Sequence, residues 1–116
     1  MQTAERLREK ILVVEPLEPR LDVVTAPRFK SYLVDRINDG NIFLVLNLGR
    51  LEFVDSSGLT AIVSTLKTLR LGGGDMTVCQ VPKNISQLFK ITKLDRVFGL
   101  FQTEEEAVRA LKNGLE

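Results

Sequence analysis

IFLVLNL at residues 42–48, followed by DSSGL at residues 55–59, decides the fold of this chain. The first run is apolar at nearly every position instead of alternating, which is typical of a strand buried on both faces of a sheet. Aspartate and serine in the second stop a strand and cap a helix, because their side-chain oxygens accept hydrogen bonds from the unpaired amides of the first helical turn. The stretch therefore predicts a buried strand, a loop and a helix. Apolar residues recur at helical spacing after the junction: Leu59, Ile62, Val63, Leu66 and Leu69.

The first part of the chain predicts one strand and does not decide whether a second strand precedes it. ILVV at residues 11–14 is apolar and β-branched, which favours a strand. Pro16 and Pro19 each remove a ladder donor, so this strand is expected to end, or to run along an edge, near Glu15. The mostly polar residues 1–10 fit either an edge strand or a loose arm.

A first helix is predicted next, because apolar residues lie three or four positions apart. Thr25 is its expected cap, Pro27 is tolerated in its first turn, and NDGN at residues 38–41 ends it. The apolar positions of this helix are Ala26, Phe29, Leu33 and Ile37.

The pattern after the DSSGL helix repeats the alternation of helix and strand. GGG at residues 72–74 ends that helix, residues 76–81 predict a strand, and residues 97–101 predict a last, short strand. Thr103 lies three residues before Glu106, which is the spacing of a capping box at the start of a closing helix. Between the two strands, Ile85, Leu88, Phe89 and Thr92 mark a short third helix.

Length and element order together predict one α/β domain. The chain has 116 residues, 44% of them hydrophobic, which is enough for a single ordinary core. Strands that alternate with helices through short connections favour right-handed crossovers and parallel strands in one sheet. We therefore assign residues 1–116 to one domain, with its core at about residues 11–112.

The charge balance argues against broad electrostatic partners. Sixteen basic and fifteen acidic residues give a formal net charge of +1, which supplies no strong field, so neither nucleic acid nor a membrane is an expected partner. No apolar run approaches the roughly 18 to 20 residues that cross a bilayer, and the first residues lack the apolar segment of a secretory signal. The expected location is the cytoplasm.

Catalysis is also disfavoured, because the chain contains no histidine. Histidine is the most common general base and the commonest nitrogen ligand of metals, so hydrolase and zinc-site interpretations become weak, and we expect neither a metal nor a cofactor. A nucleophile elbow needs a glycine two positions before the serine, where Ser56 has Val54 and Ser57 has Asp55. The single cysteine, Cys79, lies in an apolar run and is expected to be a buried strand residue.

Two further motifs have ordinary structural interpretations. The glycines at residues 72–74 lie between a helix and the next strand, whereas phosphate-binding glycines lie between a strand and the next helix. The charged segment at residues 104–112 is expected to be a solvated helix face, with acids near its N-terminus where the helix dipole favours them.

The residues around the DSSGL junction resemble a known family. LVLNL at residues 44–48 followed by LEFVDSSGL at residues 51–59 resembles the bacterial anti-sigma factor antagonists, the STAS-domain family. LDVVTA at residues 21–26 is similar to that family's Leu-Asp-x-x-Thr-Ala segment, and GGDM at residues 73–76 to its turn into the next strand. The resemblance covers roughly residues 11–112 and implies a STAS domain: a mixed, mostly parallel sheet of about four to five strands with about four α-helices, and no enzymatic activity.

The resemblance also implies a phosphorylation-controlled partner switch. Ser56 is the implied phosphorylation site, and the implied kinase is also an anti-sigma factor. The unphosphorylated chain would bind this anti-sigma factor/serine protein kinase and free a sigma factor for transcription, phosphorylation would release the kinase, and a metal-dependent PP2C-type serine phosphatase would reset the switch. The partner-binding residues implied in this way are Asp22, Thr25, Asp55, Ser56, Ser57 and Gly58.

Roles for the individual junction residues follow as hypotheses from residue type and position. Asp55 would orient the serine hydroxyl or cap the helix, Gly58 would let the kinase backbone approach closely, and Leu59 would anchor the helix to the sheet. A phosphate at a helix N-terminus is locally favourable, so we expect little unfolding when Ser56 is phosphorylated.

Two other function classes stay open. One is a STAS scaffold, or an accessory subunit of a stress-sensing complex or membrane transporter. The other is a nucleotide-binding domain or hydrolase, which tight nucleotide binding would reveal.

Overall fold

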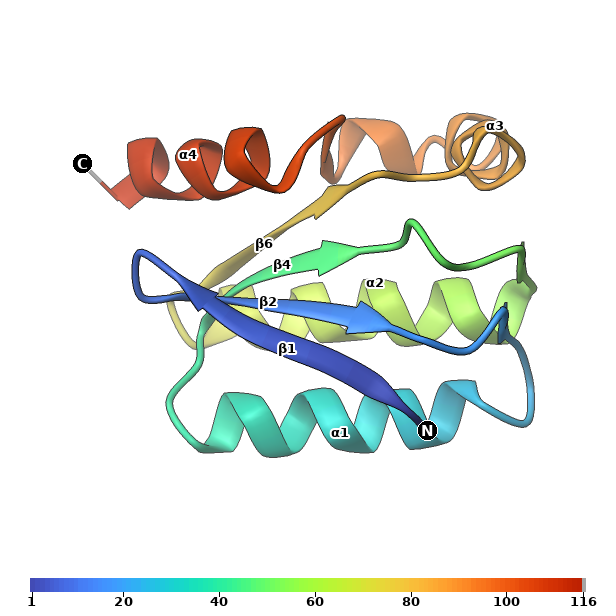
Figure 1. Cartoon of the computed structure of the whole chain (residues 1–116), viewed down its shortest axis with the longest axis horizontal. Coiled ribbons are helices and arrows are strands. Elements are labelled where there is room, and N and C mark those ends of the chain that lie inside the picture. Colours follow the sequence, from blue (N-terminus) through green and yellow to red (C-terminus); the bar gives the residue numbers. More distant parts are fainter. Residues whose placement is uncertain (116) are drawn as a thin grey trace.

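The computed structural model describes residues 1–115, and its elements alternate along the chain as in an α/β domain. Figure 1 shows a sheet between two layers of helices. The elements are β1 (Thr3–Arg8), β2 (Ile11–Pro16), β3 (Arg20–Leu21), α1 (Ala26–Asn38), β4 (Phe43–Asn47), β5 (Phe53–Val54), α2 (Ser56–Leu71), β6 (Asp75–Cys79), α3 (Lys83–Ile91), the 3₁₀ turn η1 (Leu94–Arg96), β7 (Gly99–Phe101) and α4 (Glu104–Leu115).

The main sheet of the described residues is mixed and mostly parallel, as predicted. Its strand order is β1-β2-β4-β6-β7, in which β1 and β2 pair antiparallel and all other neighbours are parallel. The short strands β3 and β5 form a separate parallel pair, with Leu21 opposite Val54. The parallel strands all end on the side where α1 and α2 begin (Figure 1), and in parallel α/β sheets this end carries ligand and partner sites.

The core lies on both faces of the sheet, because strand side chains alternate between them. Leu44 and Leu46 of β4 pack in the larger cluster with α1 and α2, whereas Val45 packs in a smaller cluster with α4. This confirms the prediction that the 42–48 run forms a strand buried on both faces. The helix residues in these clusters include Phe29, Leu33, Ile62, Leu66, Leu69, Ala107, Val108 and Leu111.

The N-terminal residues form an edge strand and not a loose arm. β1 pairs with β2 over its whole length through a tight turn at Glu9 and Lys10, whose φ angles are 54° and 72°. Both positive values match the hairpin turns whose twist suits antiparallel strands, although these residue types adopt such angles at a cost.

The expected helix ends and the buried cysteine are confirmed. α2 ends at Leu71, and Gly73 beyond it has a φ of 84°, which glycine adopts without steric cost. Cys79 is fully buried at the end of β6, and burial raises the pKa of its thiol to about 12. No helix within residues 1–115 is long and apolar enough to cross a membrane.

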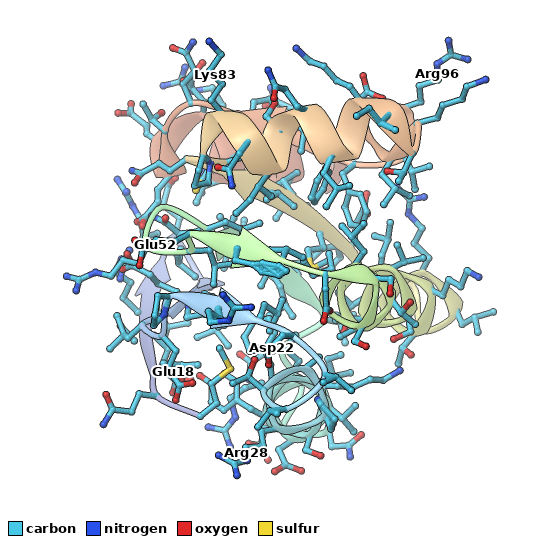
Figure 2. All side chains as sticks on the ribbon, turned by 90° about the vertical axis from the view of Figure 1, so that its right-hand side faces the viewer. Glu18, Asp22, Arg28, Glu52, Lys83 and Arg96 are labelled. Carbon is cyan, nitrogen blue, oxygen red and sulfur yellow. The ribbon has the colours of Figure 1, made fainter. Side chains whose placement is uncertain are left out.

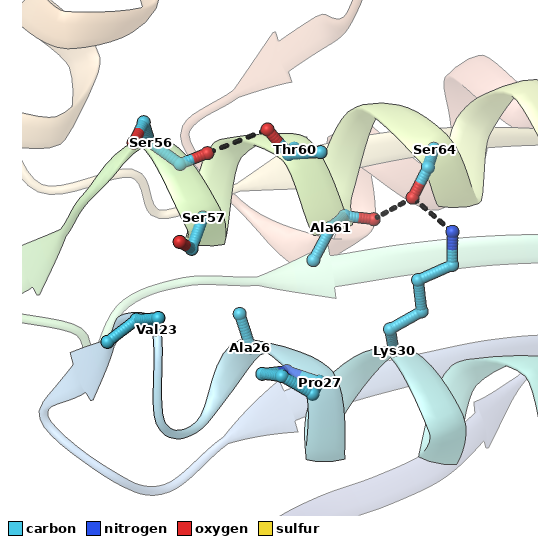
Figure 3. Close-up of a pocket in the computed structure, with 9 residues that line it drawn as sticks. All are labelled: Val23, Ala26, Pro27, Lys30, Ser56, Ser57, Thr60, Ala61 and Ser64. Carbon is cyan, nitrogen blue, oxygen red and sulfur yellow. Dashed lines mark hydrogen bonds between the residues drawn. The ribbon is translucent and has the colours of Figure 1, made fainter.

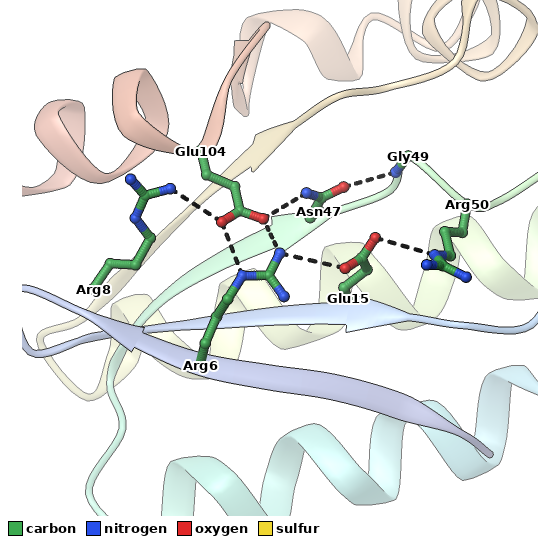
Figure 4. Close-up of polar contacts among 7 residues, drawn as sticks. All are labelled: Arg6, Arg8, Glu15, Asn47, Gly49, Arg50 and Glu104. Carbon is green, nitrogen blue, oxygen red and sulfur yellow. Dashed lines mark hydrogen bonds and ion pairs between the residues drawn. The ribbon is translucent and has the colours of Figure 1, made fainter.

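The prediction that the α4 charges form a solvated face is wrong for Glu104, which is 6% exposed. Its carboxylate accepts hydrogen bonds from Arg6 Nε at 3.0 Å, Arg8 Nη1 at 3.2 Å and Asn47 Nδ2 at 2.7 Å (Figure 4). Arg6 also contacts Glu15 of β2. The cluster joins the edge strand, the central strand β4 and the start of α4, where the helix dipole further favours a carboxylate.

Candidate functional site

The junction between β5 and α2 is a capped helix start. Asp55 has an extended backbone, and its Oδ1 accepts a hydrogen bond from the backbone amide of Gly58 at 3.0 Å. Of the two roles considered for Asp55, the structure therefore shows the cap. Ser56 is the first residue of α2 and is exposed, and Ser57 is half-buried.

The second oxygen of Asp55 brings two distant segments together. Its Oδ2 accepts a hydrogen bond from the amide of Val23 at 3.2 Å, 32 residues earlier in the chain. This bond ties the loop between β3 and α1 to the start of α2. The structure thus places Asp22 and Thr25 on the same surface as Asp55, Ser56 and Ser57.

That loop is held by its own polar side chains. Asp22 Oδ1 accepts hydrogen bonds from the amides of Val24 at 3.0 Å and Thr25 at 3.2 Å, and Asp22 Oδ2 accepts from Arg20 Nε at 3.2 Å. The bond from the Thr25 backbone is the main reason that the pKa of Asp22 is lowered. Figure 2 looks onto this end of the molecule and shows Asp22 beside the start of α1.

Thr25 does not cap α1 through its side chain, so that prediction is wrong. It stands at the N-cap position, but its backbone is helical and its hydroxyl makes no cap bond. The hydroxyl instead donates to the Arg20 carbonyl at 2.8 Å and accepts from the Asp22 amide at 3.0 Å. Thr25 therefore closes the loop, and the Asp22 carboxylate accepts from the amides of Val24 and Thr25, which precede the first turn of α1.

Gly58 permits a close approach within the chain itself. It is buried, and a Cβ atom at this position would lie 2.4 Å from the Leu21 carbonyl oxygen and 2.9 Å from Val54 Cγ1. The first turn of α2 can therefore sit directly against β3 and β5. Leu59, the next residue, is half-buried against the main core, which supports its expected role as an anchor.

Gly58→Ala is expected to lower the free energy of unfolding by about 1–3 kcal/mol, because the new methyl group meets backbone that has no room to move. Chemical denaturation monitored by circular dichroism measures the change. Gly114→Ala is the matched control, since a Cβ there meets no atom within 4 Å and alanine favours the helix of α4. Equal stabilities of the two variants would contradict the close packing of Gly58.

Two grooves flank the exposed ridge of α2. The α1–α2 groove is lined by Val23, Ala26, Pro27, Lys30, Ser56, Ser57, Thr60, Ala61 and Ser64 (Figure 3). The α2–η1 groove is lined by Ser56, Leu59, Thr60, Val63, Ser64, Lys67, Thr92 and Leu94. Ser56, Thr60 and Ser64 line both grooves, because residues four apart share one face of a helix. Ser56 is the one predicted site residue of these three, although the spacing of four between them indicates a shared helix face.

The Ser56 hydroxyl is exposed at the start of α2. Within residues 1–115, no side chain forms a hydrogen bond with it, and the Ser56 carbonyl accepts from the Thr60 hydroxyl. The same residues contain no group of three or more His, Cys, Asp or Glu side chains that could hold a metal ion.

Comparison with known proteins identifies the family. The model of the STAS domain matches residues 3–107. The chain belongs to the STAS-domain family. A protein of Staphylococcus aureus named as an anti-sigma-B factor antagonist is 35% identical over 74 residues, which are 64% of this chain and 68% of that protein.

Two further proteins match over nearly the whole chain. BtrV of Bordetella bronchiseptica, provisionally named an anti-sigma factor antagonist, is 25% identical over 90% of both chains. The crystal structure of an anti-sigma factor antagonist from Mycobacterium paratuberculosis superposes with a TM-score of 0.85 at 25% identity, covering 96% of this chain and 93% of that one. These likenesses confirm the expected family and the single α/β STAS fold.

Proposed function

We propose that this STAS protein is an anti-sigma factor antagonist that works as a phosphorylation-controlled partner switch. With Ser56 unphosphorylated it binds an anti-sigma factor that is also a serine protein kinase. Phosphorylation of Ser56 releases that partner, and a PP2C-type serine phosphatase restores binding. The protein itself carries out no catalysis in this scheme, acts in the cytoplasm and regulates transcription through a sigma factor.

The observation that carries the proposal is the position of Ser56. Its hydroxyl is exposed at the N-terminus of α2, where the two grooves meet. A phosphate there would add about −1.5 to −2 charges at the centre of the candidate contact surface. The names of the relatives from Staphylococcus aureus and Mycobacterium paratuberculosis support the same function.

The proposed partner-binding residues divide into two groups. Ser56 and Ser57 line the α1–α2 groove and would contact the partner directly. Asp22, Thr25 and Asp55 hold the loop and the helix start, so they would shape the contact surface. Gly58 is buried and would act by allowing that packing.

Phosphate mapping by mass spectrometry tests the acceptor. The protein is incubated with ATP and each purified anti-sigma factor kinase encoded in the same genome. We expect one phosphate on Ser56, none on Ser56→Ala, and the phosphate still on Ser56 in Ser57→Ala. Phosphate found on another residue, with Ser56 unmodified, would overturn the assignment.

A further inference from the structure

Two adjacent valines stand exposed beside the phosphoacceptor. Val23 is 68% exposed and Val24 is 61% exposed, and both lie in the loop between β3 and α1. Scattered exposed apolar residues are common on proteins, but a neighbouring pair next to a functional residue indicates a contact surface. Val23 lines the α1–α2 groove together with Ser56 and Ser57 (Figure 3).

The backbone of this valine pair is fixed from two sides. The Val23 amide donates to Asp55 at 3.2 Å, and the Val24 amide donates to Asp22 at 3.0 Å. Asp55 and Asp22 therefore accept hydrogen bonds from the amides of the loop, while the two valine side chains are exposed. A rigid loop that presents apolar side chains loses little conformational entropy on binding, which is what a recognition element requires.

One exposed basic side chain beside the pair, Arg28, is available to an acidic partner. Arg28 in the first turn of α1 is exposed and forms no ion pair within residues 1–115. The Lys30 ammonium donates to the Ser64 hydroxyl across the α1–α2 groove (Figure 3). Arg28 points outward at this end of the molecule (Figure 2). Asp22, in contrast, is paired with Arg20 at 3.2 Å.

We propose that Val23 and Val24 determine which partner this switch recognises, by entering an apolar cleft with an acidic rim on the anti-sigma factor kinase. The proposal rests on the proposed function and adds the residues that select the partner. The polar residues of the LDVVTA segment build the loop, and the two valines between them carry the specificity. The two valines take no part in the phosphoryl transfer. Their binding energy therefore stabilises the ground state and the transition state equally.

The double variant Val23→Thr/Val24→Thr tests the proposal, because threonine keeps the β-branched shape and replaces one methyl group with a hydroxyl. Calorimetry with the purified anti-sigma factor kinase should show affinity lowered by at least about tenfold, since each valine loses part of its burial energy. The kinase should phosphorylate Ser56 of the variant with a raised KM and an unchanged kcat, which is the signature of lost uniform binding. The variant Arg28→Glu should also lower the affinity for the kinase. The loss should be larger at low salt than at high salt, because salt screens exposed charges.

Leu7→Thr is the matched control, because Leu7 is also 68% exposed but lies on the edge strand β1. It should bind and be phosphorylated as the wild type is, and Val24→Ile should retain binding because the side chain stays apolar. Wild-type affinity of the double valine variant would overturn the inference and leave the proposed function standing. If the wild-type chain itself binds no anti-sigma factor kinase, the proposed function fails and the inference fails with it.

Discussion

Ser56→Asp is expected to weaken binding of the anti-sigma factor kinase by at least about 100-fold, whereas Ser56→Ala is expected to bind throughout. The new aspartate carboxylate places a negative charge at a position that lines both grooves and directly follows Asp55. An unpaired or like charge in an interface costs several kcal/mol, and about 1.4 kcal/mol corresponds to a factor of ten in affinity. Calorimetric titration of each variant with the purified kinase measures the effect.

The fold itself should hardly respond to this charge. An acidic group at a helix N-terminus is favourable by roughly 0.3 to 1 kcal/mol where it is exposed, so the unfolding midpoint of Ser56→Asp should stay close to that of the wild type. Thr68→Asp is the control, because Thr68 is an exposed hydroxyl residue on the same helix that lines neither groove. If both aspartate variants bind as tightly as the wild type, charge at Ser56 is not the switch.

Glu104→Gln is expected to lower the free energy of unfolding by about 2 kcal/mol at pH 7. The Arg6 guanidinium, with Asn47 and Arg8, lowers the pKa of the Glu104 carboxyl from 4.5 to about 2. At about 1.4 kcal/mol per pKa unit this corresponds to roughly 3 kcal/mol. Arg6 and Arg8 are partly exposed and can be hydrated when the carboxylate is lost, so the expected cost is somewhat smaller.

The effect has a defined pH dependence. The folded-state pKa of Glu104 is depressed, so its charge stabilises the fold fully above the unfolded pKa near 4.5 and loses that contribution as pH falls toward about 2. The difference in stability between wild type and Glu104→Gln should therefore shrink over this interval. Urea denaturation at pH 7, 4 and 3 measures it.

Glu105→Gln is the matched control for that series. Glu105 is the next residue and pairs with Arg109 at 2.9 Å, but both side chains are mostly exposed. Exposed ion pairs contribute roughly 0–1 kcal/mol, so this variant should be nearly as stable as the wild type at every pH. If Glu104→Gln lost as little stability as Glu105→Gln, the Glu104 cluster would not be a stabilising element.

Much of the fold was predictable because its signals are local. The apolar run before the junction and the helical spacing after it lie within one stretch of about thirty residues, and the glycines after Leu71 end the helix by their own conformational freedom. The same holds for Ser56, whose position after the Asp55 cap follows from neighbouring residues. The sequence does not decide between an edge strand and a loose arm for residues 1–10, because these polar residues form a strand only by pairing with β2.

The Thr25 cap failed for a local reason, since its hydroxyl bonds to Arg20 and Asp22, but two other differences arise where a residue meets a distant partner. Glu104 looks like one acid among several at a helix start, but its guanidinium partner Arg6 lies 98 residues earlier in the chain. Residue type and position suggest that Gly58 gives room to a kinase backbone, whereas in the fold it is buried against the Leu21 carbonyl of the chain itself. No local pattern contains these contacts.

The sequence by itself determined the alternation of the main strands and helices, the buried central strand and the capped helix start at Asp55 and Ser56, because periodicity and helix capping act over a few neighbouring residues. Only the tertiary structure decided that the loop of Val23 and Val24 lies against that serine and that Glu104 is buried. Both depend on hydrogen bonds and packing between segments far apart in the chain, and these form only when the sheet brings the segments together.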